Sequence, residues 1–511
     1  MKKFFAVLLA LCMLFSVCTL SLAEEEQTEP AASMMFLEGR DFLYDETESG
    51  FYMSVQVPAV YLAEEMEEAF PQLQKAFEGF NAELRQEAER IFGLMKESAT
   101  QEFIENSGYT GLESESWVEI HRAGDANAVS VLVYSCVDLG GPHPSYTYTA
   151  RTFDCTTGNV ISLSEAIKDT DMLAKILADE LKARAESEDE FLCDDLETAI
   201  RERIDSGSLV WTVDYQGMTF YFPQDDLYVY AAGPKSVFIP FGINADVFAD
   251  ADYIGTSCIG YAVSFAPDRA FSFLLSESAP ANTIYVTAVE SEDDMSELNV
   301  IVDDVKTAID WQFYMISTMS LVHMEDKNYL YVGTRGDNDY STLLVLEINP
   351  DKTVTEKGNM LCTGLYSTTG RDGYLEVLAG FDPAYFILNT TVDILSTASG
   401  YRAYETGKDG MPEPFENAYT MLTPFTLTLL QDIKNVKVID EITEKESGKT
   451  ELKAGDFVTI EVIDLEAKTI RAELTDARTV EFSYSMTDGS LPILVNGVDA
   501  EQLFDGMVYA G

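Results

Sequence analysis

His143 stands between two prolines in the segment Gly140 to Ser145, which reads Gly-Gly-Pro-His-Pro-Ser. The prolines restrict the backbone on both sides, so the imidazole is held on a rigid bend where it can donate and accept hydrogen bonds. Asp138 lies nearby, and together with His143 and Ser145 it supplies the side-chain types of a hydrolase triad. Because triads are assembled from separate elements, neighbours along one turn rarely reach the required geometry. We therefore interpret His143 as a ligand-binding residue, with a backbone-bonding role inside the loop as the alternative.

Two tyrosines follow the bend at alternate positions of a predicted strand, so their side chains share one face. A second rigid bend, Gly-Pro, follows an aromatic block further along the chain. Aromatic side chains on rigid bends give contact area at low entropic cost, which favours recognition over catalysis. The sequence therefore predicts no catalytic residue and a ligand-binding surface made of His143, Tyr146, Tyr148, Gly233 and Pro234.

The patterns of metal and nucleotide sites are missing from the sequence. Its three histidines, His121, His143 and His323, are far apart, and its cysteines form no closely spaced pair, which argues against a zinc enzyme. The turn Asp337-Asn338-Asp339 offers oxygen ligands but lacks the glycine and the distal glutamate of a calcium loop. There is no Walker loop, dinucleotide fingerprint or nucleophile elbow. We expect no cofactor and no metal.

The net charge decides which partners are plausible. It is −55 for the whole chain, and −57 once Lys2 and Lys3 are removed with the signal sequence described next. Nucleic acid is excluded as a partner, because phosphate binding requires clustered basic residues. Such a charge attracts basic proteins and cations. The alternative is that it only keeps an exported protein soluble.

The amino terminus has the three parts of a secretory signal. Two lysines precede an apolar run from Phe4 to Leu22, and Ser21-Leu22-Ala23 is a small-residue cleavage site. We predict a signal peptide over residues 1–23 and an acidic spacer over 24–35, which places the mature protein outside the cell or in the cell envelope. An uncleaved membrane anchor is the alternative, since the apolar run is nearly long enough to span a bilayer.

The first half of the chain alternates helical and strand patterns, which predicts an α+β fold with helices packed on a mostly antiparallel sheet. A strand from Tyr52 is expected to stop at Pro58. An amphipathic helix follows, and strands are expected at 117–122, 128–137 and 237–241, with a hairpin over 211–222. The apolar stripe of the helix is formed by Phe77, Phe80, Leu84, Ala88, Ile91 and Met95.

Helical periodicity nearly disappears after about residue 275, where a polar segment is typical of a linker. Strands are expected at 283–289, 298–302, 329–333 and 343–348. We predict a β-rich domain over 280–440 and a small, SH3-like β-barrel over 450–511.

Two ordered blocks stand out in the first half of the chain. The first contains Gly140-Gly-Pro-His143, Phe153-Asp154, Thr157-Gly158, Leu163 and Glu165-Ala166, and the second runs from Phe220 to Phe241. Together they resemble the extracytoplasmic domain of RsiV-type anti-sigma factors, which also occurs beside peptidoglycan deacetylase domains. The resemblance covers about residues 36–265, with subdomains expected at 36–138 and 139–265. Between Tyr230 and Gly233 the chain is shorter than the usual family segment, which puts any partner that uses that loop in doubt.

The resemblance implies binding rather than chemistry, because the understood members bind proteins, notably lysozyme. We therefore expect lysozyme, another basic protein or cell-wall glycan as the ligand. Only Met1-Lys2-Lys3 precede the apolar run, so we expect no part that holds a cytoplasmic sigma factor. The alternative is an enzyme acting on cell-wall or host glycan.

Overall fold

A computed structural model describes residues 36–509 apart from short segments at 123–126, 186, 256–259, 267–268, 277–279, 291–295, 337–340, 363, 366, 370–374, 441–442, 444 and 488–489. The predicted signal peptide and spacer lie outside the described residues, as do the turn at Asp337–Asp339 and most of the segment between the strands predicted at 117–122 and 128–137. No helix among the described residues is long and apolar enough to cross a membrane.

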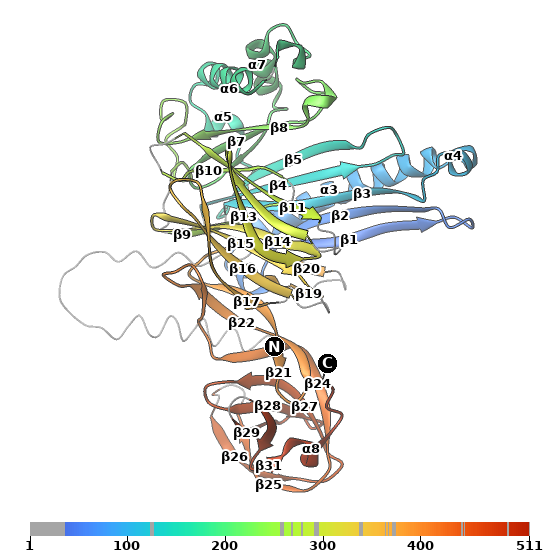
Figure 1. The fold of residues 1–511 in the computed structure, drawn as a ribbon, viewed down its shortest axis with the longest axis vertical. Coiled ribbons are helices and arrows are strands. Elements are labelled where there is room, and N and C mark those ends of the chain that lie inside the picture. Colours follow the sequence, from blue (N-terminus) through green and yellow to red (C-terminus); the bar gives the residue numbers. More distant parts are fainter. Residues whose placement is uncertain are drawn as a thin grey trace, which may run out of the picture.

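A described sheet of twelve strands, which we call the main sheet, runs through both halves of the chain, in the order β17-β16-β15-β14-β9-β20-β1-β2-β3-β4-β5, with β19 beside β20 (Figure 1). Neighbouring strands are antiparallel except β2 and β3. The strands are β1 Phe36–Glu46, β2 Tyr52–Leu62, β3 Gly111–Arg122, β4 Ala128–Val137, β5 Ser145–Asp154, β9 Gly260–Ser264, β14 Met315–Met324, β15 Lys327–Arg335, β16 Ser341–Ile348, β17 Val354–Leu361, β19 Ser367–Thr369 and β20 Leu375–Phe381.

Helix α3 (Pro71–Ser98) covers one face of β1 to β5, as the spacing of its apolar residues predicts (Figure 1). Its buried residues are the predicted stripe together with Leu73. The ring of Phe77 meets Phe36 of β1 and Phe153 of β5 edge-on, which ties the helix to both strands. Short helices flank it, α2 at Glu64–Glu67 and α4 at Gln101–Asn106.

The expectation that Pro58 ends its strand is wrong. Strand β2 continues to Leu62, and Pro58 pairs with Arg40 of β1. The other edge of β2 pairs with β3 only along Tyr52–Val55. Beyond that pairing, the missing N–H of a proline costs no hydrogen bond to β3.

Gly158 closes the turn between β5 and α5 (Leu163–Ala166) with a φ of +69°, and its N–H donates to the carbonyl of Asp154 (2.9 Å). A Cβ at Gly158 would lie 2.3 Å from the carbonyl oxygen of Gln72, at the start of α3. Helix α5 begins with a capping box at Ser162, whose N–H donates to the Glu165 carboxylate (2.7 Å). The turn therefore fixes the end of β5 against the main helix.

Gly158→Ala is expected to destabilise the protein by about 2 kcal/mol or more, because it combines a left-handed backbone with a backbone clash. Gly207→Ala is the matched control, since Gly207 has a φ of +70° but open space around its Cβ position. Urea unfolding should show the larger loss for Gly158→Ala. Equal losses would mean that the contact with Gln72 does not constrain the turn.

A smaller layer packs above the main sheet and contains the rest of the helices of the first half (Figure 1). Its three strands follow the order β6-β7-β8, and its core joins them to α6 and α7. The elements are α6 Thr170–Arg184, η1 Glu188–Glu190, α7 Leu196–Ser206, β6 Val210–Val213, β7 Gly217–Phe222, η2 Tyr230–Ala232 and β8 Lys235–Pro240. The predicted hairpin and the strand after it are confirmed.

The second half begins with a four-stranded sheet that packs on β9 and β14 to β16. The opposite face of those strands packs against β21 and β22 of a thirteen-stranded described sheet, which forms the far end of the molecule (Figure 1). The four-stranded sheet contains β10 Phe271–Phe273, β11 Asn282–Glu290, β12 Ser296–Val302 and β13 Val305–Phe313. The thirteen-stranded sheet contains β18 Gly364–Leu365, β21 Phe386–Asp393, β22 Thr397–Thr406, β23 Pro412–Pro414, β24 Ala418–Leu429, β25 Ile433–Ile439, β26 Glu446–Leu452, β27 Phe457–Asp464, β28 Thr469–Leu474, β29 Thr479–Thr487, β30 Ser490–Val495, β31 Val498–Asp499 and β32 Phe504–Asp505, with α8 at Ala500–Leu503.

The predicted α+β class, with mostly antiparallel sheets followed by β-rich modules, is confirmed. The domain boundaries stay predictions, and two features bear on them. Strand β1 pairs with β20, so the main sheet takes strands from both sides of the interval 265–280. The last hydrophobic core draws residues from Val392 to Phe504, so it begins well before residue 450. The likeness of that unit to an SH3 barrel also stays a prediction.

Candidate functional site

Four aromatic side chains form a ladder across β3, β4 and β5, which we call the aromatic face: Trp117, Tyr134, Tyr146 and Tyr148. The strand register places Trp117 opposite Tyr134, and Tyr134 opposite Tyr148. The ring centroids of Trp117 and Tyr134 are 5.6 Å apart, and those of Tyr134 and Tyr148 are 5.2 Å apart. Tyr146, two residues before Tyr148 on β5, stacks on Tyr134 with ring centroids 5.7 Å apart and only 11° between the ring planes.

Strand alternation puts this ladder on the side of the sheet that α3 does not cover. On β3, Val118 and Ile120 pack toward the helix, so Trp117 and its alternate neighbours point the other way. All four aromatic side chains are half-buried, and none belongs to a hydrophobic core cluster. Their outer ring surfaces therefore remain in contact with solvent, which is unusual for a group of this size.

Carboxylates border the aromatic face at its outer end. Glu113 and Glu115 are exposed and lie on the same side of β3 as Trp117. The Glu113 carboxylate accepts a hydrogen bond from the Tyr52 hydroxyl (2.6 Å), and Tyr52 stacks on Tyr44 of β1. Aromatic rings and carboxylates thus continue from β5 across to β1.

At its inner end the aromatic face meets a buried ion pair between Arg269 and Glu119. Glu119 is 1% exposed and also accepts from the backbone N–H of Ala266 (3.1 Å). Burial raises the pKa of Glu119, but the Arg269 guanidinium and His121 oppose this and hold it below its usual value. The guanidinium carbon of Arg269 lies 5.4 Å from the centre of the Tyr134 ring, within the range of a cation–π contact.

Burial also raises the pKa of the phenols in this ladder. The effect is large for Tyr134 and smaller for Tyr146, while Arg269 partly opposes it at Tyr148. All three phenols are therefore neutral at physiological pH and present hydroxyl groups, not charges. The free thiol of Cys136 has its pKa raised by burial as well, so it is no reactive thiolate.

His143 stacks on Tyr230, with ring centroids 4.7 Å apart. The Tyr230 hydroxyl donates to the carbonyl of Pro144 (2.7 Å), so the loop before β5 is fastened to η2. Gly233 and Pro234 follow η2 directly, and Gly233 has a φ of +69°. This contact brings the two predicted bends together beside the aromatic face.

The triad weighed for His143 is not assembled in the described part of the chain. The Asp138 carboxylate accepts from the N–H of Gly140 (2.7 Å), and Ser145 pairs with Val137 at the start of β5. No hydrogen bond joins either residue to His143 there, and the imidazole stacks on Tyr230. The residues are therefore not arranged for nucleophilic catalysis.

The sequence analysis missed Trp117, Tyr134 and Arg269. The first two lie on predicted strands, and their alternation with core valines was a usable signal. Arg269 reaches the face from the loop after β9, and nothing in its local sequence indicates this contact.

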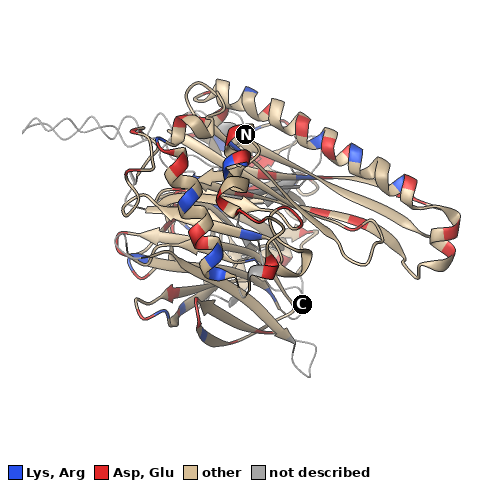
Figure 2. Ribbon diagram, turned by 90° about the horizontal axis from the view of Figure 1, so that it is seen from above, with Lys and Arg blue, Asp and Glu red and all other residues tan. Residues whose placement is uncertain are grey.

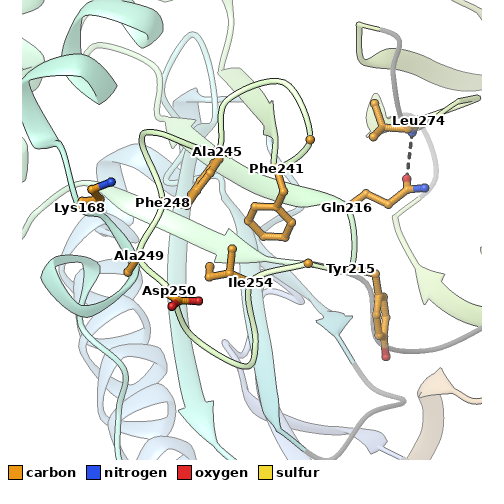
Figure 3. Close-up of a pocket in the computed structure, with 12 residues that line it drawn as sticks. Lys168, Tyr215, Gln216, Phe241, Ala245, Phe248, Ala249, Asp250, Ile254 and Leu274 are labelled. Carbon is orange, nitrogen blue, oxygen red and sulfur yellow. Dashed lines mark hydrogen bonds between the residues drawn. The ribbon is translucent and has the colours of Figure 1, made fainter.

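A separate pocket of about 680 Å³ lies beside the turn between β6 and β7 (Figure 3). Phe241, Phe248 and Ile254 supply apolar surface, and Lys168 and Asp250 supply charge. Gln216 also lines it, with its amide oxygen accepting from the N–H of Leu274 (3.1 Å). None of its lining residues belongs to the aromatic face. In the described ranges, no group of three or more His, Cys, Asp or Glu residues is placed to hold a metal ion.

No protein-family model and no curated protein matches the chain. Among solved structures, it is similar to a DUF3298 family member from Bacteroides fragilis, with 14% identity, a TM-score of 0.33, and coverage of 44% of this chain and 98% of that one. It is also similar to a DUF3298 family protein from Pseudomonas aeruginosa, with 13% identity, a TM-score of 0.27, and coverage of 43% and 97%. The chain is thus similar in part to domains of unknown function. At these identities and TM-scores the likeness assigns neither a fold nor an activity.

Proposed function

We propose that this protein is an exported binding protein of the cell envelope or the extracellular space, and that its aromatic face takes a basic protein, with lysozyme as the first candidate. The observation that carries the proposal is the half-buried ladder of Trp117, Tyr134 and Tyr146 bordered by exposed carboxylates. Rigid aromatic surface supplies short-range contact area, and the carboxylates select cationic side chains. The resemblance of residues 36–265 to RsiV-type domains supports lysozyme in particular.

The charge of the chain supports a basic partner but does not locate a site. Figure 2 shows Asp and Glu residues spread over helices and strands rather than gathered on one surface. A diffuse field speeds the approach of any basic protein, and salt screens it. A specific site differs because its packed contacts persist when the field is screened.

We expect lysozyme to bind and to remain bound in roughly 0.5 M salt, where the Debye length is about 4 to 5 Å. Tyr146→Ala should weaken this binding about tenfold, because it removes a half-buried ring that stacks on Tyr134. Calorimetric titration at low and high salt measures both effects. Tyr148 is a poorer test, since its ring also contacts buried Tyr221, with centroids 5.1 Å apart, and we expect its loss to perturb the fold.

Phe457→Ala is the matched control, because Phe457 is a 52% exposed aromatic residue on β27, at the opposite end of the molecule (Figure 1). It should bind lysozyme like the unchanged protein. If binding disappears at 0.5 M salt, or if Tyr146→Ala and Phe457→Ala behave alike, the attraction is only electrostatic and the proposal fails. Aromatic rings also stack on sugars, so soluble peptidoglycan fragments are titrated in parallel. Tyr146-dependent binding of these fragments alone would replace the basic protein with a glycan.

A further inference from the structure

We propose that the outer end of the aromatic face holds an arginine side chain of the basic partner, in the way that its inner end holds Arg269. The inference rests on the proposed function and specifies which group of the partner is recognised. It comes from a repeated arrangement on β3, in which Glu119 and Glu115 lie on either side of the aromatic pair Trp117 and Tyr134. The cation position beside Glu119 is filled by Arg269 of the chain itself.

The inner position shows what this surface binds. Arg269 lies over the Tyr134 ring and pairs with Glu119, two residues along β3 from Trp117. The guanidinium therefore contacts a ring face and a carboxylate at the same time. This combination suits arginine, whose planar, weakly hydrated cation stacks on aromatic rings and bonds to carboxylates.

The outer position repeats these groups without an occupant from the described chain. Glu115 lies two residues from Trp117 in the other direction, so its side chain is on the same face at a similar spacing. It is exposed and makes no hydrogen bond or ion pair with the described residues. Opposite Glu115 on the neighbouring strands lie Cys136 and then Tyr146, whose ring covers Tyr134. Strand alternation and register therefore place Glu115 on the same face of the sheet as the rings of Trp117 and Tyr146, where an incoming cation would meet all three.

Arginine is favoured over lysine for a physical reason. A lysine ammonium is compact and strongly hydrated, so it gives up more hydration energy when it leaves water for an aromatic surface. A guanidinium can stack and still donate to the Glu115 carboxylate. The surface should therefore discriminate between two side chains of equal charge.

The probes are N-acetyl-L-arginine amide and N-acetyl-L-lysine amide, which carry the same charge. The chain has three tryptophans, so ¹⁵N-labelled indole groups give three signals, and Trp117→Phe identifies that of Trp117. Trp311 serves as an internal reference, because it lies on β13, outside the aromatic face, and its indole N–H donates to Thr334 of β15 (2.9 Å). We expect the arginine probe to shift the Trp117 signal with at least threefold higher affinity than the lysine probe.

Glu115→Gln should weaken binding of the arginine probe about fivefold and remove most of the preference over lysine. Glu356→Gln is the matched control, since Glu356 is an exposed strand carboxylate on β17, at the other edge of the sheet. Equal affinities for the two probes, or equal effects of the two variants, would overturn the inference. Lysozyme that binds through Tyr146 without an arginine preference would overturn it and leave the proposed function intact. An arginine preference without lysozyme binding would support it and reject lysozyme as the partner.

Discussion

Replacing Arg269 with alanine should lower the free energy of unfolding by about 3 to 5 kcal/mol, because it leaves the buried Glu119 carboxylate without the charge that it pairs with. Its partner Glu119 is 1% exposed and would lose the guanidinium that holds its pKa below the usual 4.5. Because that folded pKa is lowered, the stability contributed by Glu119 is present above pH 4.5 and is lost as the pH falls below it. Urea unfolding at pH 7.5 measures the loss.

The double variant Glu119→Gln, Arg269→Met separates charge from packing. It removes both charges and keeps side chains of similar size, so it should recover most of the stability lost by Arg269→Ala. A loss below about 1 kcal/mol for Arg269→Ala would show that solvent reaches Glu119. The inner end of the aromatic face would then not be the enclosed cation site described above.

Asp214→Asn should stabilise the protein at neutral pH by up to about 3 kcal/mol. Burial raises the pKa of Asp214 from 3.8 to about 6. Each pH unit between these two values corresponds to about 1.4 kcal/mol of folding free energy. Its Oδ1 accepts from the N–H groups of Gln216 (2.9 Å) and Gly217 (3.1 Å), and an asparagine oxygen can keep both bonds. The substitution therefore removes a buried charge without leaving these donors unpaired.

The stabilisation by Asp214→Asn depends on pH. Between pH 3.8 and about 6 the folded protein holds this proton more tightly than the unfolded chain, so stability falls as the pH rises through that window. Asp214→Asn should match the unchanged protein near pH 3.5 and exceed it at pH 7.5. Urea unfolding at both values checks this. Lower stability of the variant at pH 7.5 would mean that attraction to the buried Arg122 outweighs the cost of burial.

Local pattern was enough to predict helix α3 and the tyrosines of β5. The helix has an apolar stripe of constant period, and Tyr146 and Tyr148 alternate along a strand, so both follow from neighbouring residues alone. The turn at Gly158 was equally predictable, because its residues leave few other conformations.

Pairing between distant segments was not predictable in the same way. The contact of β1 with β20 joins residues more than three hundred positions apart, and no local pattern indicates it. The same holds for the stacking of His143 on Tyr230 and for Arg269. Pro58 was misjudged because its effect depends on which edge of β2 is paired, and this becomes known only with the sheet order.

Hydroxyl-radical footprinting of the complex with lysozyme tests most directly whether the aromatic face is the binding surface. In 0.5 M salt, lysozyme should reduce oxidation of Trp117, Tyr134 and Tyr146, whose outer ring surfaces it would cover. Tyr509 is 40% exposed near the carboxyl end and should be oxidised equally with and without lysozyme. Unchanged oxidation of the three aromatic residues, with lysozyme shown to be bound, would contradict the account.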